Sequence, residues 1–211
     1  MTHYNSESYT PSSQAEGTLN IDPLSVDPLN FDKAPPQGSF PVIPDGTLLR
    51  VSLWIRHGNY QDSTSSLKWA HGYATKSPTT GSVYLSCEYT VTEEGPYCGN
   101  KIWGLIGLHS DKSTKWADMG RSFIRGILNS ARGYGEKDES PEAKAARQIR
   151  SLSDLNTLEF VARVDVEMDK EKNEPRNVIK MAITKGHDAY EVHSGFSAGA
   201  SSSDIPYQKS W

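Results

Sequence analysis

Basic and aromatic side chains alternate along one segment of the chain in a way that suits unpaired nucleic acid. Between residues 50 and 56, one set of alternate positions includes Arg50, Trp54 and Arg56. Guanidinium groups bind phosphates and an indole stacks on an exposed base, so this combination predicts a site for single-stranded nucleic acid. A tryptophan on a strand face also commonly packs beneath a loop or helix, and that structural interpretation stays open.

Two further segments repeat this pairing of charge with aromatic rings. The loop after residue 56 contains, in order, Lys68, Trp69, His71, Tyr73 and Lys76. A later segment contributes Lys101 and Trp103. Repetition across a strand, a loop and a second strand favours a nucleic-acid surface over an isolated coincidence.

Three arginines add a basic stripe to a predicted helix. At 100° per residue, Arg121, Arg125 and Arg132 fall within about 40° of one another on the side opposite the apolar residues. Arg121 and Arg125 are therefore candidates for phosphate contacts. The alternative is an ordinary solvated helix face.

The sequence offers little for catalysis or metal binding. The histidines at 57, 71, 109, 187 and 193 are scattered, without acidic or cysteine partners at metal-ligand spacing. There is no phosphate loop, dinucleotide fingerprint or nucleophile elbow. We therefore predict a protein that is not an enzyme, with no metal and no cofactor.

Charge is unevenly distributed along the 211 residues, whose net charge is −4. Residues 1–45 contain six acidic residues and one lysine, whereas residues 46–135 contain ten basic and six acidic residues. The basic block is compatible with nucleic acid, although many surfaces with such a charge bind nothing. No apolar run is long enough to span a membrane, and the N-terminus lacks a signal-peptide pattern. These features predict a soluble cytoplasmic protein in which Cys87 and Cys98 are free thiols.

Strict alternation of apolar and polar residues predicts the strands that must position these side chains. Three strands are expected at 48–56, 82–92 and 101–108, and the turn 95–99 joins the second and third in a hairpin. Two more are expected at 160–168 and 177–184, separated by a charged turn.

Two helices are expected between the third and fourth strands. The first begins near Ser110 or Asp111 and ends at Gly133 or Gly135. Its predicted core side consists of Trp116, Met119, Phe123, Ile127 and Ala131. The second has Ser140 as its N-cap and runs to about residue 151.

Five strands with a helix after the third form the order of an OB-fold barrel, so we predict a mainly β, five-stranded OB-like barrel. An open sheet packed on the long helix is the alternative. The predicted domain covers 46–186, with a helical insertion at about 136–156. Residues 1–45, which include a tandem Asp-Pro-Leu repeat, and residues 187–211 are predicted to be a disordered acidic tail and a flexible tail.

The segment from Gly81 to Trp103 resembles a family of phage and prophage proteins. The residues that carry the resemblance are Tyr84-Leu85 in one strand, the turn Gly95-Pro96-Tyr97-Cys98-Gly99 and the pair Lys101 and Trp103. It extends through residues 117–132 and 158–164, about half the chain. Members of this family are similar to phage single-stranded-DNA-binding proteins with an OB-fold. The departures are Glu93-Glu94 before the turn, Cys98 at a variable position and the insertion.

The resemblance implies a single-stranded-DNA-binding protein of phage-type replication or recombination, acting in the bacterial cytoplasm. Near the C-terminus, Asp204-Ile205-Pro206-Tyr207 is similar to the acidic tip that bacterial single-strand binders offer to partner enzymes. Two rivals remain. One is a protein-interaction module that uses its tails, and the other is a structural accessory protein with a β-barrel core.

Overall fold

The structure is a computed structural model, and it describes residues 41–61 and 66–195. Contacts divide the chain into Met1–Ser39 and Phe40–Trp211, and the first unit lies wholly outside the described residues. The elements, in chain order, are β1 (Thr47–Arg56), η1 (Lys68–Ala70), β2 (Ala74–Lys76), β3 (Val83–Val91), β4 (Lys101–His109), α1 (Thr114–Ala131), α2 (Pro141–Ala146), η2 (Leu152–Leu155), β5 (Glu159–Asp169), β6 (Glu174–Ile183) and α3 (Tyr190–His193).

The strands form one six-stranded antiparallel sheet rather than the five strands expected. β3 lies at its centre, with β4 along one edge and both β1 and β2 along the other. β1 also pairs with β5, which forms a hairpin with β6. The additional strand is the short β2, which continues the line of β1 beside the first residues of β3.

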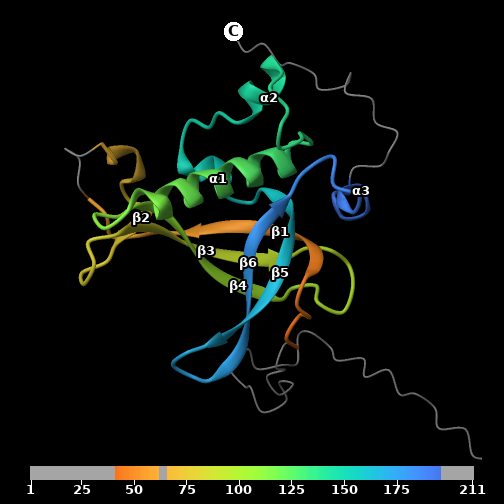
Figure 1. Ribbon diagram of the computed structural model, residues 1–211, viewed down its shortest axis with the longest axis horizontal. Helices are drawn as coiled ribbons and strands as arrows, with labels where there is room; N and C mark the ends of the chain where they lie inside the picture. Colours follow the sequence, from red (N-terminus) through yellow and green to blue (C-terminus); the bar gives the residue numbers. More distant parts are fainter. Residues whose placement is uncertain (1–40, 62–65, 196–211) are drawn as a thin grey trace, which may run out of the picture. The chain divides into compact units, whose positions relative to one another are not determined.

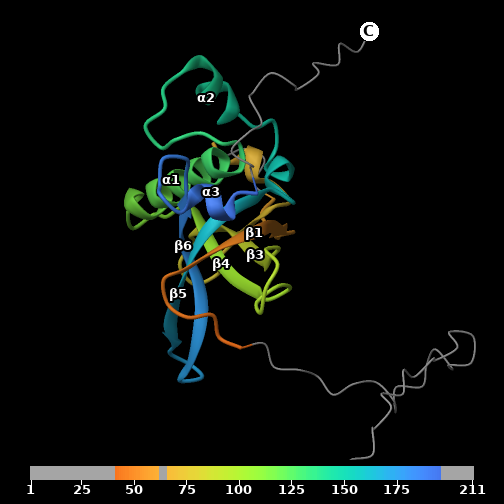
Figure 2. The same ribbon diagram turned by 90° about the vertical axis from the view of Figure 1, so that its right-hand side faces the viewer.

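The sheet is open, which corrects the expectation of a closed barrel. β4 and β6 approach each other, but no hydrogen-bonded pairing joins them in the described part of the chain. α1 packs on both strands and lies across one end of the sheet, while the β5–β6 hairpin projects away from it (Figures 1 and 2). The arrangement is thus mainly β, and it matches the alternative of an open sheet packed on the long helix.

Period-two alternation produces the core. Alternate residues of β1 and β3 are buried on the same face, because successive side chains of a strand point to opposite sides. Phe160 from β5 joins them, with edge-on ring contacts to Tyr89 at 6.1 Å and to Phe123 of α1 at 6.4 Å between ring centroids. The core therefore lies between the sheet and α1.

α1 approaches β4 at a glycine pair. The predicted core side is confirmed for Phe123, Ile127 and Ala131, but this contact displaces Met119 from it. A Cβ on Gly120 would lie 1.9 Å from the backbone oxygen of Gly107, so the two backbones touch. The predicted core residue Met119 is consequently 69% exposed, whereas Ile127 and Leu128 are buried. The helix also begins later than expected, with Ser113 as its N-cap.

Two arginines hold in place the segment between α1 and β5, residues 132–158, which we call the excursion. Arg132 donates to the backbone oxygens of Ala146 and Gln148. Arg147 donates to the side-chain oxygen of Asn129 at 2.8 Å. Ser140 caps α2 as predicted, but this helix ends at Ala146 and is followed by a separate turn, η2.

The packed part of the chain extends beyond both predicted boundaries, 46 and 186. Ile43 is fully buried, and its backbone exchanges two hydrogen bonds with the side chain of Asn177, at 2.9 and 2.7 Å. Tyr190 of α3 is also buried, and its hydroxyl donates to the backbone oxygen of Ser130 at 2.6 Å. Ile43 and Tyr190 thus anchor the polar segments on either side of the predicted domain to its core. Within the described residues, no helix combines the length and apolar character needed to cross a membrane.

The two cysteines are expected to differ sharply in reactivity. Cys98 is exposed in the β3–β4 turn, whereas Cys87 is buried and burial raises its pKa from 9.0 to about 12. Because only the thiolate reacts readily, a disulfide reagent at pH 8 should modify Cys98 in the native protein and Cys87 only after unfolding.

The raised pKa of Cys87 predicts that the free energy of unfolding decreases at high pH. A folded-state pKa above the unfolded value means that the neutral Cys87 thiol contributes its full stability below about pH 9. That contribution falls as the pH rises toward 12. Urea unfolding across this range should show a declining midpoint, with a smaller decline in Cys87→Ala. Equal alkaline losses in both proteins would contradict this assignment.

Candidate nucleic-acid interface

The outer face of β1, β3 and β4 brings together four of the predicted binding residues. Strand register places Trp54 opposite Glu88, and Glu88 opposite Trp103 on the other side. The neighbouring rows are Ser52–Thr90–Lys101 and Arg56–Ser86–Leu105. Trp54, Arg56, Lys101 and Trp103 therefore lie on one continuous surface, which we call the tryptophan face and define by these three rows.

The aromatic groups of the tryptophan face are open to solvent. Trp54 is 49% exposed, Trp103 57% and Leu105 59%. Both indoles stay open although α1 reaches this side of the sheet at one end, where Trp116 contacts Tyr84 and packs on Gly107. The two rings are thus available for stacking, which the alternation of residues alone could not decide.

Charges on the tryptophan face are mixed. Lys101 Nζ lies 2.5 Å from Glu88 Oε1, across the diagonal between adjacent strands. Arg56 is exposed and forms no ion pair with any described residue. Counting described residues alone, the surface consequently offers one unpaired guanidinium, one lysine shared with a carboxylate and two accessible indoles.

Arg50 is held within the domain rather than presented to a ligand. Its Nε lies 3.4 Å from Glu159 Oε2, and its side chain is only 27% exposed. Gly195, the last described residue, covers it, because a Cβ on this glycine would lie 2.1 Å from the guanidinium. His193, two residues earlier, contacts Glu93 at 2.9 Å, and Glu93 also accepts a hydrogen bond from the Arg50 backbone amide. This cluster docks the C-terminal segment against β1.

The predicted loop residues fall in a separate region around η1 and β2. Trp69 is 45% exposed and Lys68 is exposed beside it. Tyr73 is half-buried and stacks on His57, with 5.4 Å between ring centroids. Lys76 is exposed at the end of β2. Through His57, which directly follows Arg56, Tyr73 lies close to one end of the tryptophan face.

The arginines of α1 do not form a free ladder. Arg125 donates to Glu139 at 2.8 Å and to the backbone oxygen of Glu136 at 3.3 Å, and this hydrogen bonding lowers the pKa of Glu139 below 4.5. With Arg132 bonded to backbone oxygens, only Arg121 is exposed and without an ion pair among the described residues. The stripe chiefly ties the excursion to the helix.

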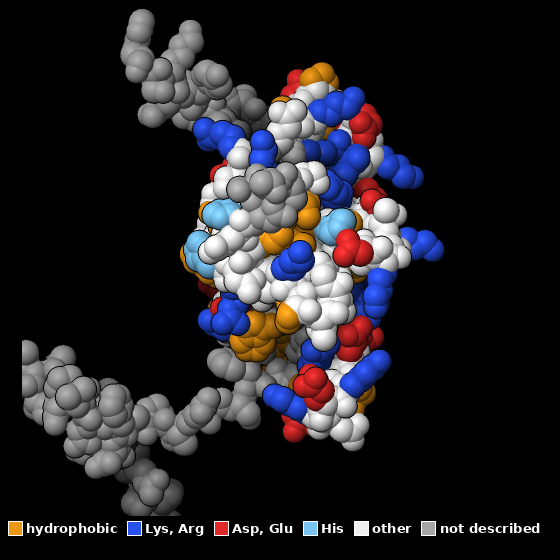
Figure 3. All heavy atoms as spheres, turned by 90° about the vertical axis from the view of Figure 1, so that its left-hand side faces the viewer, with side chains coloured by type: hydrophobic (Ala, Val, Ile, Leu, Met, Phe, Trp, Pro, Cys, Tyr) orange, Lys and Arg blue, Asp and Glu red, His pale blue; other side chains and the backbone are white. Residues whose placement is uncertain are grey.

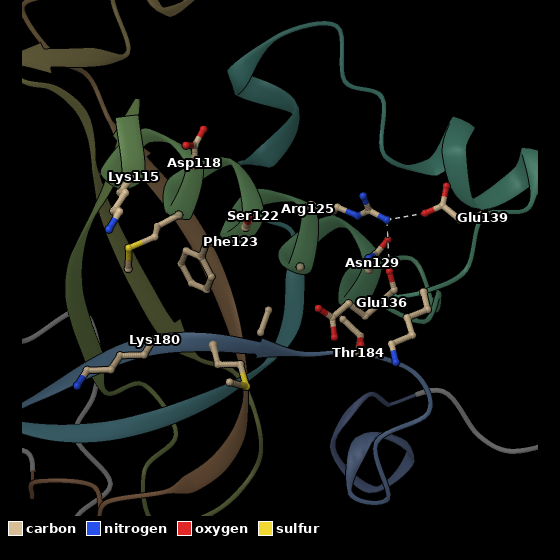
Figure 4. Close-up of a pocket in the computed structure, with 15 residues that line it drawn as sticks. Lys115, Asp118, Ser122, Phe123, Arg125, Asn129, Glu136, Glu139, Lys180 and Thr184 are labelled. Carbon is tan, nitrogen blue, oxygen red and sulfur yellow. Dashed lines mark hydrogen bonds and ion pairs between the residues drawn. The ribbon is translucent and has the colours of Figure 1, made fainter. Parts of the chain in front are cut away.

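Arg125 lines a groove of about 1040 Å³ between α1 and β6. Figure 4 shows Phe123 inside it, with Lys115 and Lys180 toward one end and the Arg125–Glu139 pair at the other. Met119 and Met181, both exposed, also line it. Acidic and basic side chains both line the groove, so its electrostatic potential is not uniformly positive. It is therefore not suited to a polyanion such as a nucleic acid.

Mixed charge is a general property of the visible surface. In Figure 3 lysines and arginines are spread along the upper part and one margin of the domain with acidic side chains between them, and hydrophobic side chains form a separate patch. A nucleic-acid site on this side of the molecule would therefore rely on local contacts and stacking more than on a broad basic surface.

Five of the nine residues of the tryptophan face were not among the predicted site residues, and two of them, Leu105 and Glu88, bear on its chemistry. Leu105 continues the alternation Lys101, Trp103, Leu105 and could have been found from that pattern. Glu88 lies between the indoles only because of strand register, for which the sequence carried no local signal. The partner motif Asp204-Ile205-Pro206-Tyr207 lies outside the described residues, as does the Asp-Pro-Leu repeat.

The part of the chain that the structure describes contains no group of three or more histidine, cysteine or acidic side chains that could hold a metal ion. No family model matches the sequence, and no curated protein matches it significantly.

Proposed function

We propose that this protein binds single-stranded DNA through the tryptophan face. The observation that carries the proposal is the row Trp54–Glu88–Trp103, which presents two half-exposed indoles on one surface beside Arg56 and Lys101. Stacking on aromatic rings and phosphate contacts from basic side chains are the two components of single-strand binding without strong sequence preference.

The arrangement of strands supports the same proposal. β1 pairs with both β3 and β5, and a helix follows β4, as in an OB-fold in which only the closing pair of strands is missing. OB-folds bind oligonucleotides on the face of their second and third strands, which correspond here to β3 and β4. On that comparison the tryptophan face would occupy this surface, and the loop with Trp69 and Tyr73 would be the one that flanks it.

We place this activity in phage-type DNA replication or recombination in a bacterial cytoplasm, on the resemblance described for residues 81–103. Recombination or replication proteins would be the partners, recruited through the terminal segments. The competing function is a protein-interaction module, which the apolar content of the same face also favours, because exposed aromatic and leucine side chains are typical of protein interfaces.

Titration with oligo-dT at low salt is expected to quench tryptophan fluorescence, because bases would stack on Trp54 and Trp103. Affinity should fall with salt, and Arg56→Ala should reduce the slope of log K against log salt by about 0.7, the value for one phosphate contact. Arg150→Ala, an exposed arginine in the excursion before β5, is the matched control and should leave the slope unchanged.

Removing residues 1–39 separates the two functions. A DNA site on the sheet should keep its affinity without that unit, whereas an interaction module that depends on the N-terminal segment should lose its partner. Absence of quenching at low salt would rule out DNA binding.

A further inference from the structure

The two indoles of the tryptophan face are spaced to hold one flat ring between them. Both are direct cross-strand neighbours of Glu88, so their Cα atoms are two strand spacings apart, roughly 10 Å. They make no ring contact with each other among the described residues. A base between two rings needs two van der Waals distances, about 7–8 Å in total. A modest lean of the two side chains would therefore form a slot for a single base.

Glu88, which lies between the two tryptophans in the row, would form the floor of such a slot. Its side chain is 21% exposed, and Lys101 Nζ contacts only Oε1. Oε2 accepts no hydrogen bond from the described residues. An ionised carboxylate has several acceptor sites, so both oxygens can still receive donors from a ligand. The lysine offsets the charge that would otherwise repel a nucleic acid.

The chemistry of the floor discriminates among bases. Guanine presents two adjacent donors on its Watson–Crick edge, N1–H and the N2 amino group, which match the two oxygens of a carboxylate. Adenine and cytosine offer one amino donor each. Thymine offers an N–H between two carbonyl oxygens, and those oxygens would face the carboxylate with their own negative charge. A hydrogen bond to an ionised acceptor is stronger than one between neutral groups.

We propose that Glu88, lying between Trp54 and Trp103, makes the tryptophan face a guanine-preferring stacking site. This inference rests on the proposed function, and it adds a base preference to a surface that would otherwise bind any single strand. The expected order of affinity is guanine first, then adenine and cytosine, then thymine.

The test measures fluorescence anisotropy with labelled pentanucleotides TTXTT, in which X is each of the four bases. The unmodified protein should bind the guanine-containing strand about tenfold more tightly than the all-thymine strand, because two charge-assisted hydrogen bonds replace repulsion. In Glu88→Gln that ratio should fall to about twofold or less, because an amide replaces one acceptor with a donor. Glu94→Gln removes the same charge from an exposed position in the adjacent turn and should keep the tenfold ratio.

The possible results distinguish a failure of the guanine preference from a failure of DNA binding itself. Equal affinity for all four strands, or a guanine preference that survives in Glu88→Gln, would overturn the inference while leaving DNA binding in place. A failure of every strand, and of longer oligo-dT, to bind at low salt would overturn the proposed function itself. Loss of the preference in both glutamine variants would assign it to overall charge and also overturn the role of Glu88.

Discussion

Replacing Trp54 and Trp103 together with alanine is expected to weaken binding of single-stranded DNA by about 100-fold. Stacking of a base on an aromatic side chain contributes about 1–3 kcal/mol, and both exposed rings of the tryptophan face would be lost. The fold should persist, because neither indole lies in the core. Anisotropy of a labelled oligo-dT is the appropriate measurement, since the variant lacks the tryptophans whose fluorescence would report binding.

A matched control removes exposed apolar side chains that lie outside the three rows of the tryptophan face. Met168 is 55% exposed near the tip of the β5–β6 hairpin and Val192 is 77% exposed in α3. The double variant Met168→Ala/Val192→Ala should bind oligo-dT as the unmodified protein does. If both double variants lost affinity equally, a specific stacking surface on β1 and β4 would be excluded. If the tryptophan variant kept full affinity, the site would have to lie elsewhere, with Trp69 the next candidate.

Gly120→Ala is expected to destabilise the domain by about 3 kcal/mol or more. Its Cβ would lie 1.9 Å from the oxygen and 2.9 Å from the carbonyl carbon of Gly107, and backbone cannot move aside as a flexible side chain can. α1 would have to shift away from β4 and disturb the packing of Ile127 and Leu128. For a domain of this size the melting temperature should fall by roughly 6–12 °C.

Gly126→Ala in the same helix is the internal comparison. Its Cβ would lie 3.4 Å from the Cβ of Ala182, an ordinary contact, so the alanine should be accommodated. Because alanine is the better helix former, the domain should gain about 0.5–1 kcal/mol. Thermal unfolding of the two variants side by side checks both expectations. Equal losses of stability would show that the β4–α1 contact has no special role.

The absence of hydrogen bonds between β4 and β6 in the described residues affects how rigidly the tryptophan face is held. In a closed barrel the face of β3 and β4 would be fixed from both edges, whereas here β4 pairs only with β3 in the described part of the chain. The Gly107–Gly120 contact then supports β4 from the helix side. Gly120→Ala should therefore also reduce DNA affinity, although it lies outside the tryptophan face.

The sequence by itself determined five of the six strands, all but β2, and for β1 and β3 the faces of their side chains. Leu49 to Ile55 and Val83 to Val91 alternate, and the burial pattern follows that alternation residue by residue. The β3–β4 hairpin was predictable from its glycine-rich turn, and α2 from the cap at Ser140. These features depend on local backbone preferences and on period, which neighbouring residues encode.

Only the tertiary structure decided which of these side chains act together. Arg50 and Trp54 share a strand face, yet the C-terminal segment covers the first and leaves the second exposed. Met119 fits a helical core pattern, but the backbone contact at Gly120 turns it outward.

Closure of the sheet and the place of Glu88 likewise depended on long-range pairing. Whether β4 meets β6, and which residue lies opposite Trp54, is set by register between segments far apart in the chain. Period two assigns a residue to a face but carries no information about its cross-strand neighbour. The two tryptophans were therefore visible in the sequence, whereas the carboxylate between them emerged only when three strands came together.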